Sequence, residues 1–411
     1  MTDVGVDRRK AARPFVRLLA INALGLYAMV MYGITYYAIT TAAPRMAAEF
    51  GYPGSSIFAV LTVSLLMTAV LAQRLGRLTD RIGASNILLG GALLRCAMLA
   101  GMALAPEPLT FALALLLVQI LGQATEYDAT FAAAVELAGE KARSGMSQIT
   151  LWGGLASTAF WPATAFLLER MTWRSMFLVY AAVLLVICVP IAAFIRAVSD
   201  HGRAAKLAPA VAARVDGSAA PSHEPQQSDL PPFWLLAAAF ALGGVAYNLP
   251  SLMLPVLDGL GLGASAVVVG LIFGPAQTAG RFVDMIVGDR VRAISVAVVA
   301  SAMVAVAFVV LLTGGVWAAI AFAVLFGAGA GVGYVVRGSV VLAFYGQQGY
   351  ATWLGRLGTV RLVVTALSPL GLALILERLG AHAVIVVCGA AAVLSLTCFA
   401  ALAAGKATRR T

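Results

Sequence analysis

Long apolar stretches recur along this chain, and short polar segments that contain most of its charged residues separate them. A helix needs about 20 mostly apolar residues to cross the hydrocarbon core of a bilayer, and about twelve stretches meet this requirement. We therefore predict an all-α integral membrane protein with about twelve transmembrane helices. The predicted spans are 16–46, 55–75, 86–105, 109–137, 145–168, 175–197, 233–257, 264–287, 291–314, 316–345, 353–376 and 381–404.

The composition excludes a water-soluble globular fold. Hydrophobic residues make up 61% of the 411 residues and charged residues 11%, whereas soluble domains average roughly 45–50% and about 25%. The mean hydropathy is +0.94. Because such a chain cannot bury all its apolar surface against itself, lipid must be the solvent for much of it. The four cysteines lie in apolar runs without the spacing of metal ligands, so we expect no metal and no cofactor.

A segment of different composition divides the chain. Residues 199–232 are rich in Ala, Pro, Ser and charge and contain no aromatic residue, which is typical of a flexible linker. Half of the predicted spans precede this segment and half follow it. We expect a six-helix bundle over residues 1–197, a cytoplasmic linker over 198–231 and a second six-helix bundle over 232–411.

The two halves show signs of an internal repeat. Several identities recur in order at an offset of about 207 residues. The matched pairs are Gly122 with Gly329, Tyr127 with Tyr334, Gly139 with Gly346, and Pro162 with Pro369. They favour two pseudo-symmetric six-helix bundles, as in transporters built from parallel repeats.

The charge pattern predicts the orientation in the membrane. With the N-terminus inside, cytoplasmic segments carry about nineteen Lys and Arg residues and outer loops about four, which agrees with the positive-inside rule. Both termini and the linker should therefore face the cytoplasm. We expect the protein in the inner (plasma) membrane of the cell. The net charge of +10 follows from this pattern, and we expect no nucleic-acid partner.

The segment between the second and third spans has a recognisable motif. It runs Gly76-Arg77-Leu78-Thr79-Asp80-Arg81-Ile82-Gly83. This resembles the signature loop of the major facilitator superfamily, Gly-x-x-x-Asp-Arg-x-Gly, except that Ala84-Ser85 replaces the basic pair that usually follows. The resemblance implies a conformational switch built on Gly76, Asp80, Arg81 and Gly83. An aspartate at a helix end can pair with an arginine or meet the N-terminus of a neighbouring helix.

The eighth span resembles a particular branch of that superfamily. The segment Gly274 to Arg281 looks like the eighth span of monocarboxylate porters and oxalate/formate-type antiporters, where a polar residue stands four positions before a substrate-facing arginine. Gln277 and Arg281 fit this spacing and share one helical face. The resemblance implies that Arg281 binds an anion. Asp284 follows Arg281, which differs from the order in monocarboxylate porters, and the drug-antiporter signature is absent from the fifth span.

Charged residues at membrane depth are costly and usually functional. This chain places seven there: Arg95, Glu126, Asp128, Arg281, Asp284, Arg337 and Arg361. Arg281 and Arg361 belong to spans that flank the central cavity in the superfamily, and two arginines there would suit a carboxylate. The alternatives are a structural pair between Arg281 and Asp284 and carbonyl partners for Arg361.

Glu126 and Asp128 are candidates for proton coupling, because a carboxylate in low dielectric can hold a proton near neutral pH. The alternative is a structural pair with Arg95. Tyr127 and Tyr334, at equivalent positions of the two halves, are candidate hydrogen-bond donors to substrate. Other tyrosines in the first and seventh spans are further candidates or interfacial anchors.

Two functions fit these features. The first is a monomeric secondary transporter of a small, monocarboxylate-like organic anion, coupled to protons or to a counter-anion, that works by alternating access. The second is proton-driven efflux of drugs or toxic metabolites. A membrane receptor would need an output domain, for which the linker and tails are too short. No enzyme motif and no Walker A sequence occurs, so we expect neither catalysis nor ATP-driven transport.

Overall fold

The computed structural model describes residues 3–53, 55–200, 233–263, 265–287 and 290–408, and throughout these ranges the regular elements are helices. The all-α prediction is confirmed. The predicted linker 198–231 lies almost wholly outside the described residues.

The first half of the chain forms six long helical segments. Four of them contain a break or a wide turn within the apolar run. Their elements are α1 (Asp3–Tyr32), η1 (Gly33–Ala38) and α2 (Ile39–Glu49); α3 (Ser55–Ile82); α4 (Ala84–Leu104); α5 (Pro108–Ile120), α6 (Gly122–Thr125) and α7 (Tyr127–Ala138); α8 (Ala142–Gly154) and α9 (Ala156–Arg170); and α10 (Trp173–Val183), continuing through η3 (Leu184–Cys188) to Asp200.

The second half repeats this plan. Its elements are α12 (Phe233–Tyr247), η5 (Leu249–Leu252) and α13 (Met253–Gly259); α14 (Ser265–Val287); α15 (Ala293–Leu312); α16 (Gly315–Tyr345); and α17 (Tyr350–Thr408). The last element is two helices joined at Gly380, where φ is +83°.

The predicted spans agree with these helices to within a few residues at most ends. Ten helices among the described residues are long and apolar enough to cross a membrane. The last of them contains two spans because it bends at Gly380, and α14 adds a 23-residue helix that carries Arg281 and Asp284. The count of about twelve follows from these observations.

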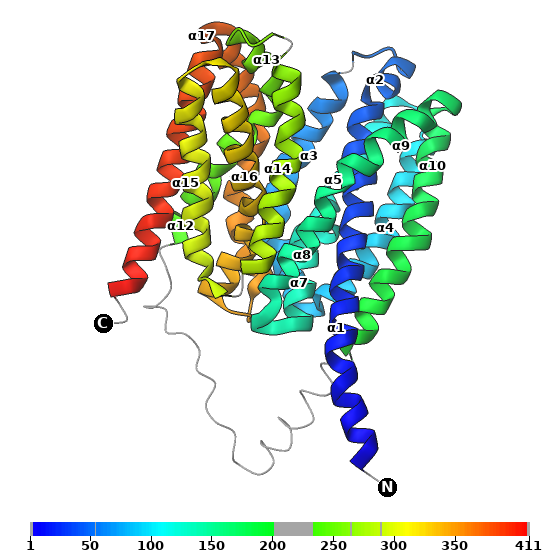
Figure 1. Ribbon diagram of the computed structural model, residues 1–411. Coiled ribbons are helices and arrows are strands. Elements are labelled where there is room, and N and C mark those ends of the chain that lie inside the picture. Colours follow the sequence, from blue (N-terminus) through cyan, green and yellow to red (C-terminus); the bar gives the residue numbers. More distant parts are fainter. Residues whose placement is uncertain (1–2, 54, 201–232, 264, 288–289, 409–411) are drawn as a thin grey trace.

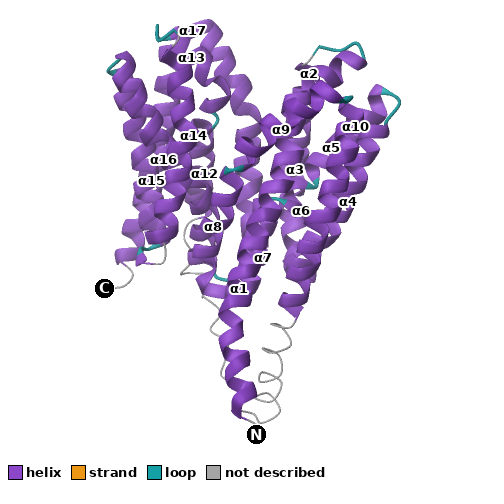
Figure 2. Ribbon diagram, turned by 45° about the vertical axis from the view of Figure 1, so that its right-hand side comes forward, coloured by secondary structure: helices purple, strands orange, loops and turns teal. Residues whose placement is uncertain are grey.

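The helices stand side by side in two groups (Figure 1). Elements α1 to α10 form one group and α12 to α17 the other. Figure 2 shows the groups close together toward the end that carries both termini, here called the termini end, and diverging toward the far end.

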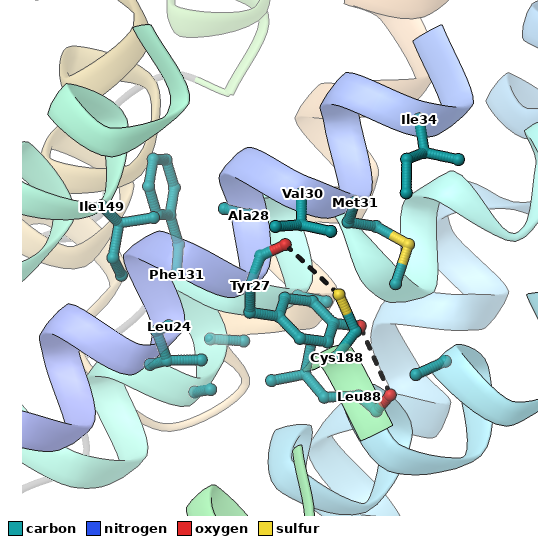
Figure 3. Close-up of a cluster of buried hydrophobic side chains, with 14 of the residues drawn as sticks. Leu24, Tyr27, Ala28, Val30, Met31, Ile34, Leu88, Phe131, Ile149 and Cys188 are labelled. Atoms are coloured by element: carbon teal, nitrogen blue, oxygen red, sulfur yellow. Dashed lines mark hydrogen bonds between the residues drawn. The ribbon is translucent and has the colours of Figure 1, made fainter. Parts of the chain in front are cut away.

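Close packing within each group depends on small residues and on a few buried polar contacts. In the first group, the Tyr27 hydroxyl donates to the Leu88 carbonyl at 3.5 Å, and the Cys188 thiol lies 3.9 Å from the Tyr27 carbonyl (Figure 3). In the second group, a Cβ at Gly331 would overlap the Gln277 carbonyl oxygen, so α14 and α16 approach closely there. Such small-residue crossings are the usual way in which membrane helices gain packing contacts.

The two groups meet along α3 and α17 near the termini end. A Cβ at Gly76 would overlap the Ala351 carbonyl oxygen, and a Cβ at Gly355 would overlap the Ala72 carbonyl oxygen. The two glycines therefore provide a reciprocal close approach between the first and second halves.

Candidate functional site

Several spans depart from regular helix in their central parts. The π-helical turn η1 interrupts the first span at Gly33–Ala38. Glu126 separates α6 from α7 with an extended backbone, φ −101° and ψ −151°. The short 3-10 helix η5, Leu249–Leu252, separates α12 from α13. Discontinuous helices at membrane depth are typical of transporter binding sites, because unwound backbone is tolerated where it lines a site.

Aromatic rings connect these irregular segments across both halves. Tyr32 stacks on Tyr36 with centroids 4.9 Å apart and lies 6.0 Å from Tyr127. The Tyr127 ring is 6.4 Å from Tyr334, and Tyr334 is 6.5 Å from Tyr247. The equivalent tyrosines of the predicted repeat thus meet at the boundary between the halves. This series of rings is called the tyrosine chain below.

Arg281 lies at one side of the tyrosine chain. Its guanidinium carbon is 5.2 Å from the centroid of the Tyr334 ring, a cation–π arrangement. Nη1 donates to the Thr150 carbonyl at 2.9 Å, and Nε donates to the Gly331 carbonyl at 3.3 Å. The residue is only 4% exposed. In the part of the chain that the structure describes, no carboxylate pairs with it.

Asp128 joins the two halves through two arginines. Its Oδ1 is 2.7 Å from Nη2 of Arg337, and its Oδ2 is 3.9 Å from Nη2 of Arg361. Gln123 donates to Oδ2 at 2.8 Å. The Nε atoms of Arg337 and Arg361 are buried without a hydrogen-bond partner among the described residues. One carboxylate therefore faces two guanidinium groups.

Glu126 pairs within the first half. Its Oε1 accepts a hydrogen bond of 2.8 Å from Arg95, and Arg95 also donates to the Thr125 hydroxyl at 2.6 Å. The Arg95 side chain is fully buried, whereas the Glu126 side chain is 25% exposed. The structural pair with Arg95 that the sequence left open as an alternative is present for Glu126. Asp128 instead pairs with arginines of the other half.

Asp284 also bonds across the halves rather than to Arg281. Ser147 donates to its Oδ2 at 2.6 Å, and Arg143 lies 3.4 Å from its Oδ1. Arg143 donates in addition to the Val291 carbonyl. Arg281 and Asp284 lie one turn apart on α14. Both bond to α8, so the two helices are joined at two successive turns.

The charges of this region do not balance. Among the residues of the contacts described above, five arginines stand against three carboxylates, an excess of two positive charges. The arginines are Arg95, Arg143, Arg281, Arg337 and Arg361, and the carboxylates are Glu126, Asp128 and Asp284. An uncompensated buried guanidinium is costly, so such a region favours an anion.

Gln277 takes no part in the hydrogen bonds and ion pairs of this region among the described residues. Its side chain is half-buried, and its backbone carbonyl packs against Gly331. It shares a helical face with Arg281, but its amide makes no hydrogen bond to the other described residues.

The motif expected as a loop is largely helical, because α3 continues to Ile82 and only Gly83 leaves the helix, with φ +94°. Asp80 accepts hydrogen bonds from the backbone N–H of Ala351 at 3.1 Å and of Thr352 at 2.7 Å. The carboxylate thus meets the N-terminus of α17, the second of the two arrangements expected for it. Arg81 is exposed.

Some residues of this region carry no sequence signal that would have identified them. Thr150 and Gly331 contribute backbone carbonyls, and carbonyls are present at every position. A Cβ at Gly153 would overlap the Tyr127 hydroxyl, and a Cβ at Gly154 would lie 2.7 Å from Arg281 Nη1. Arg143 precedes the predicted fifth span 145–168 by two residues, yet it is 8% exposed and paired with Asp284.

Comparisons with known proteins agree with this architecture. The family model described as Major Facilitator Superfamily matches residues 25–288. The human organic anion transporter MFSD10 (TETRAN) superposes with a TM-score of 0.66 at 17% identity, covering 93% of this chain and 99% of that chain. The proton:xylose symporter XylE bound to 6-bromo-6-deoxy-D-glucose gives 0.63 at 13% identity, covering 94% and 95%. A search of curated proteins finds no match. At these identities the structural likeness shows the fold alone.

Proposed function

Because this chain belongs to the Major Facilitator Superfamily and is a multi-pass membrane transporter, we propose that it carries a small organic anion by alternating access. The two helix groups would rock about the tyrosine chain and expose the site to one side of the membrane at a time. The monocarboxylate-like substrate inferred from the eighth span is part of this proposal.

The environment of Arg281 is the observation that carries the proposal. A guanidinium has five N–H donors, and Arg281 uses two of them on carbonyl oxygens, which carry no formal charge. A carboxylate would supply the missing negative charge in a bidentate geometry. Arg361, which has one distant charge partner at 3.9 Å, would provide a second positive group.

Tyr127, Tyr334 and Gln277 would contact the body of the substrate. The two tyrosine hydroxyls donate no hydrogen bond to other described residues and are not sealed inside the protein. A hydroxyl with this freedom can donate to a substrate oxygen. The Gln277 amide makes no hydrogen bond to the other described residues, so it would be available to a substrate oxygen.

Proton coupling would use Glu126 or Asp128. Each carboxylate now pairs with arginine. Separation of Arg337 and Arg361 from Asp128 during the transition would free its oxygens to accept a proton in place of the arginines. Anion exchange without a proton would leave both pairs intact.

The switch and the orientation complete the proposal. Asp80 would hold α17 while the termini end is closed. Gly76 would permit the close approach, Gly83 would end the helix and Arg81 would face the membrane surface.

Both termini would face the cytoplasm in the inner (plasma) membrane, because the basic residues gather at the termini end. We expect a monomer.

Uptake of labelled small carboxylates into proteoliposomes tests this function, with and without a pH gradient. Saturable uptake of at least one carboxylate is expected, with an amine of similar size, such as benzylamine, excluded. Transport of the amine in preference to every carboxylate would contradict the proposal.

A second function is favoured by one observation, the number of aromatic rings near the site. Such rings suit bulky hydrophobic compounds, and the protein would then export drugs or toxic metabolites in exchange for protons. Resistance of cells to such a compound, lost in Glu126→Gln while carboxylate uptake is absent, would favour this alternative.

A further inference from the structure

The tyrosine chain is larger than a simple carboxylate requires. It includes Tyr32, Tyr36, Tyr127, Tyr334 and Tyr247, and it extends through Tyr37 to Trp161, whose centroids are 5.3 Å apart. Tyr32 and Tyr37 are also 5.3 Å apart, edge to face. The rings come from the first, fourth, fifth, seventh and tenth spans, so no single helix accounts for the gathering.

The hydroxyls of these tyrosines have no hydrogen-bond partner in the part of the chain that the structure describes. Among the described residues, the one fully buried tyrosine hydroxyl without a partner is that of Tyr345, which lies elsewhere. The six tyrosines of the chain make no hydrogen bond through their hydroxyls and are absent from that fully buried set. Their hydroxyls therefore keep access to solvent or to a ligand, since a tyrosine hydroxyl that is shut off from water usually has a partner.

The chain leads from exposed rings to the buried charge. Tyr36 is 44% exposed and Trp161 is 54% exposed, whereas Tyr334, further along the chain, lies under the guanidinium of Arg281. A molecule that enters along these rings meets aromatic faces first and a positive charge last. This order matches a ligand with a flat body and one anionic end.

We propose that the substrate is an aromatic carboxylate, with its carboxylate at Arg281 and its ring against Tyr127 and Tyr334. This inference rests on the proposed transport of organic anions and narrows it to a substrate class. Ring–ring contacts with centroids 4.5–7 Å apart contribute beyond the burial of area, and they discriminate a flat ring from a puckered aliphatic one of equal charge.

Gly153 positions the central ring. The Tyr127 hydroxyl occupies the space that a side chain at residue 153 would fill. The absence of a side chain at residue 153 thereby lets the Tyr127 hydroxyl pack against α8 and sets the position of the ring. We assign Gly153 as a positioning residue for aromatic selectivity, acting through Tyr127 rather than by touching the substrate.

Competition binding with benzoate and cyclohexanecarboxylate tests the substrate class. The two probes share charge and approximate size and differ in the flat ring. The wild-type protein should bind benzoate about tenfold more tightly than cyclohexanecarboxylate, as aromatic contacts predict. Tyr334→Phe should keep this ratio because it keeps the ring, whereas Tyr334→Leu should bring the ratio close to one.

Gly153→Ala should lower the ratio as well, and Gly90→Ala provides its control because a Cβ at residue 90 meets nothing within 4 Å. Thermal unfolding of each variant identifies any that fails to fold, and the wild-type ratio alone decides the substrate class. Equal binding of both probes by the wild type would overturn the aromatic inference and leave anion transport standing. Binding of neither probe, nor of acetate or lactate, would overturn both.

Discussion

The guanidinium of Arg281 donates a 2.9 Å hydrogen bond to the backbone carbonyl of Thr150, which belongs to the opposite half of the molecule. The bond joins α14 to α8 at the level where the tyrosine chain crosses between the halves. Any movement that separates α8 from α14 must therefore release one donor of Arg281. Substrate binding and separation of the halves are coupled through the same side chain, because an anion would compete with the carbonyl for that donor.

Gly154→Ala should weaken anion binding. The new methyl group would lie 2.7 Å from Nη1 of Arg281, so the guanidinium must move away from Thr150. We expect a loss of about tenfold in carboxylate affinity, comparable to one charged hydrogen bond. The matched control is Gly274→Ala on the helix that carries Arg281, since a Cβ there meets nothing within 4 Å. Equal affinities for the two variants would contradict this role.

Asp128→Asn should destabilise the folded protein. The change leaves Arg337 and Arg361 facing each other without a counter-charge, and removal of one partner from a buried pair costs about 3–5 kcal/mol. Thermal unfolding in detergent should show a clearly lower midpoint. The double variant Asp128→Asn with Arg337→Gln should recover part of the loss. If the double variant is as unstable as the sum of the single variants, the pair is not coupled.

Asp80→Asn should shift the molecule away from closure at the termini end. The carboxylate accepts two backbone N–H groups at the start of α17, and loss of this charged cap costs about 1 kcal/mol, a roughly fivefold change in population. Spin labels on α3 and α17 near this end would report longer distances by pulsed electron paramagnetic resonance. An unchanged distance distribution would argue against the latch.

Gly355→Ala should also lengthen the distances between labels on α3 and α17. Its methyl group would overlap the Ala72 carbonyl oxygen at the crossing of these two helices. Gly358→Ala lies one turn further along α17 and meets nothing within 4 Å, so it should leave the distances as they are. The same pair of labels serves for both variants. Equal behaviour of the two would mean that the crossing does not control closure.

Glu126→Gln tests proton coupling apart from substrate binding. A neutral side chain cannot carry the proton, so uptake driven by a pH gradient should be lost while exchange of labelled for unlabelled substrate continues. Glu126→Asp serves as the control, since it retains the acid beside Arg95. Gradient-driven uptake that survives in Glu126→Gln would exclude this residue and leave Asp128 as the candidate.

The fold was predictable because the bilayer imposes a simple constraint on sequence. Apolar runs long enough to span it gave helix ends close to those observed, for example 84–104 against the predicted 86–105. The repeat was also visible: Gly139 and Gly346, matched by offset, both end helices with positive φ, at 61° and 73°. Only glycine adopts such a conformation readily, which is why the identity recurs.

The partners of the buried charges were less predictable. Sequence spacing suggested Asp284 for Arg281, yet Asp284 bonds to Ser147 and Arg143 of the other half. Pairing between distant helices depends on how the halves close, and local spacing contains no information about it. Backbone carbonyls such as that of Thr150 leave no signal in a sequence at all.

The affinity of the purified protein for benzoate, measured by isothermal titration in wild type, Arg281→Ala and Arg378→Ala, tests the central claim most directly. Arg378 is an exposed arginine beyond the site and controls for loss of one positive charge. The account predicts that Arg281→Ala loses at least about a hundredfold in affinity, as expected for a buried charged contact, while Arg378→Ala binds like the wild type. Unchanged affinity in Arg281→Ala would contradict it.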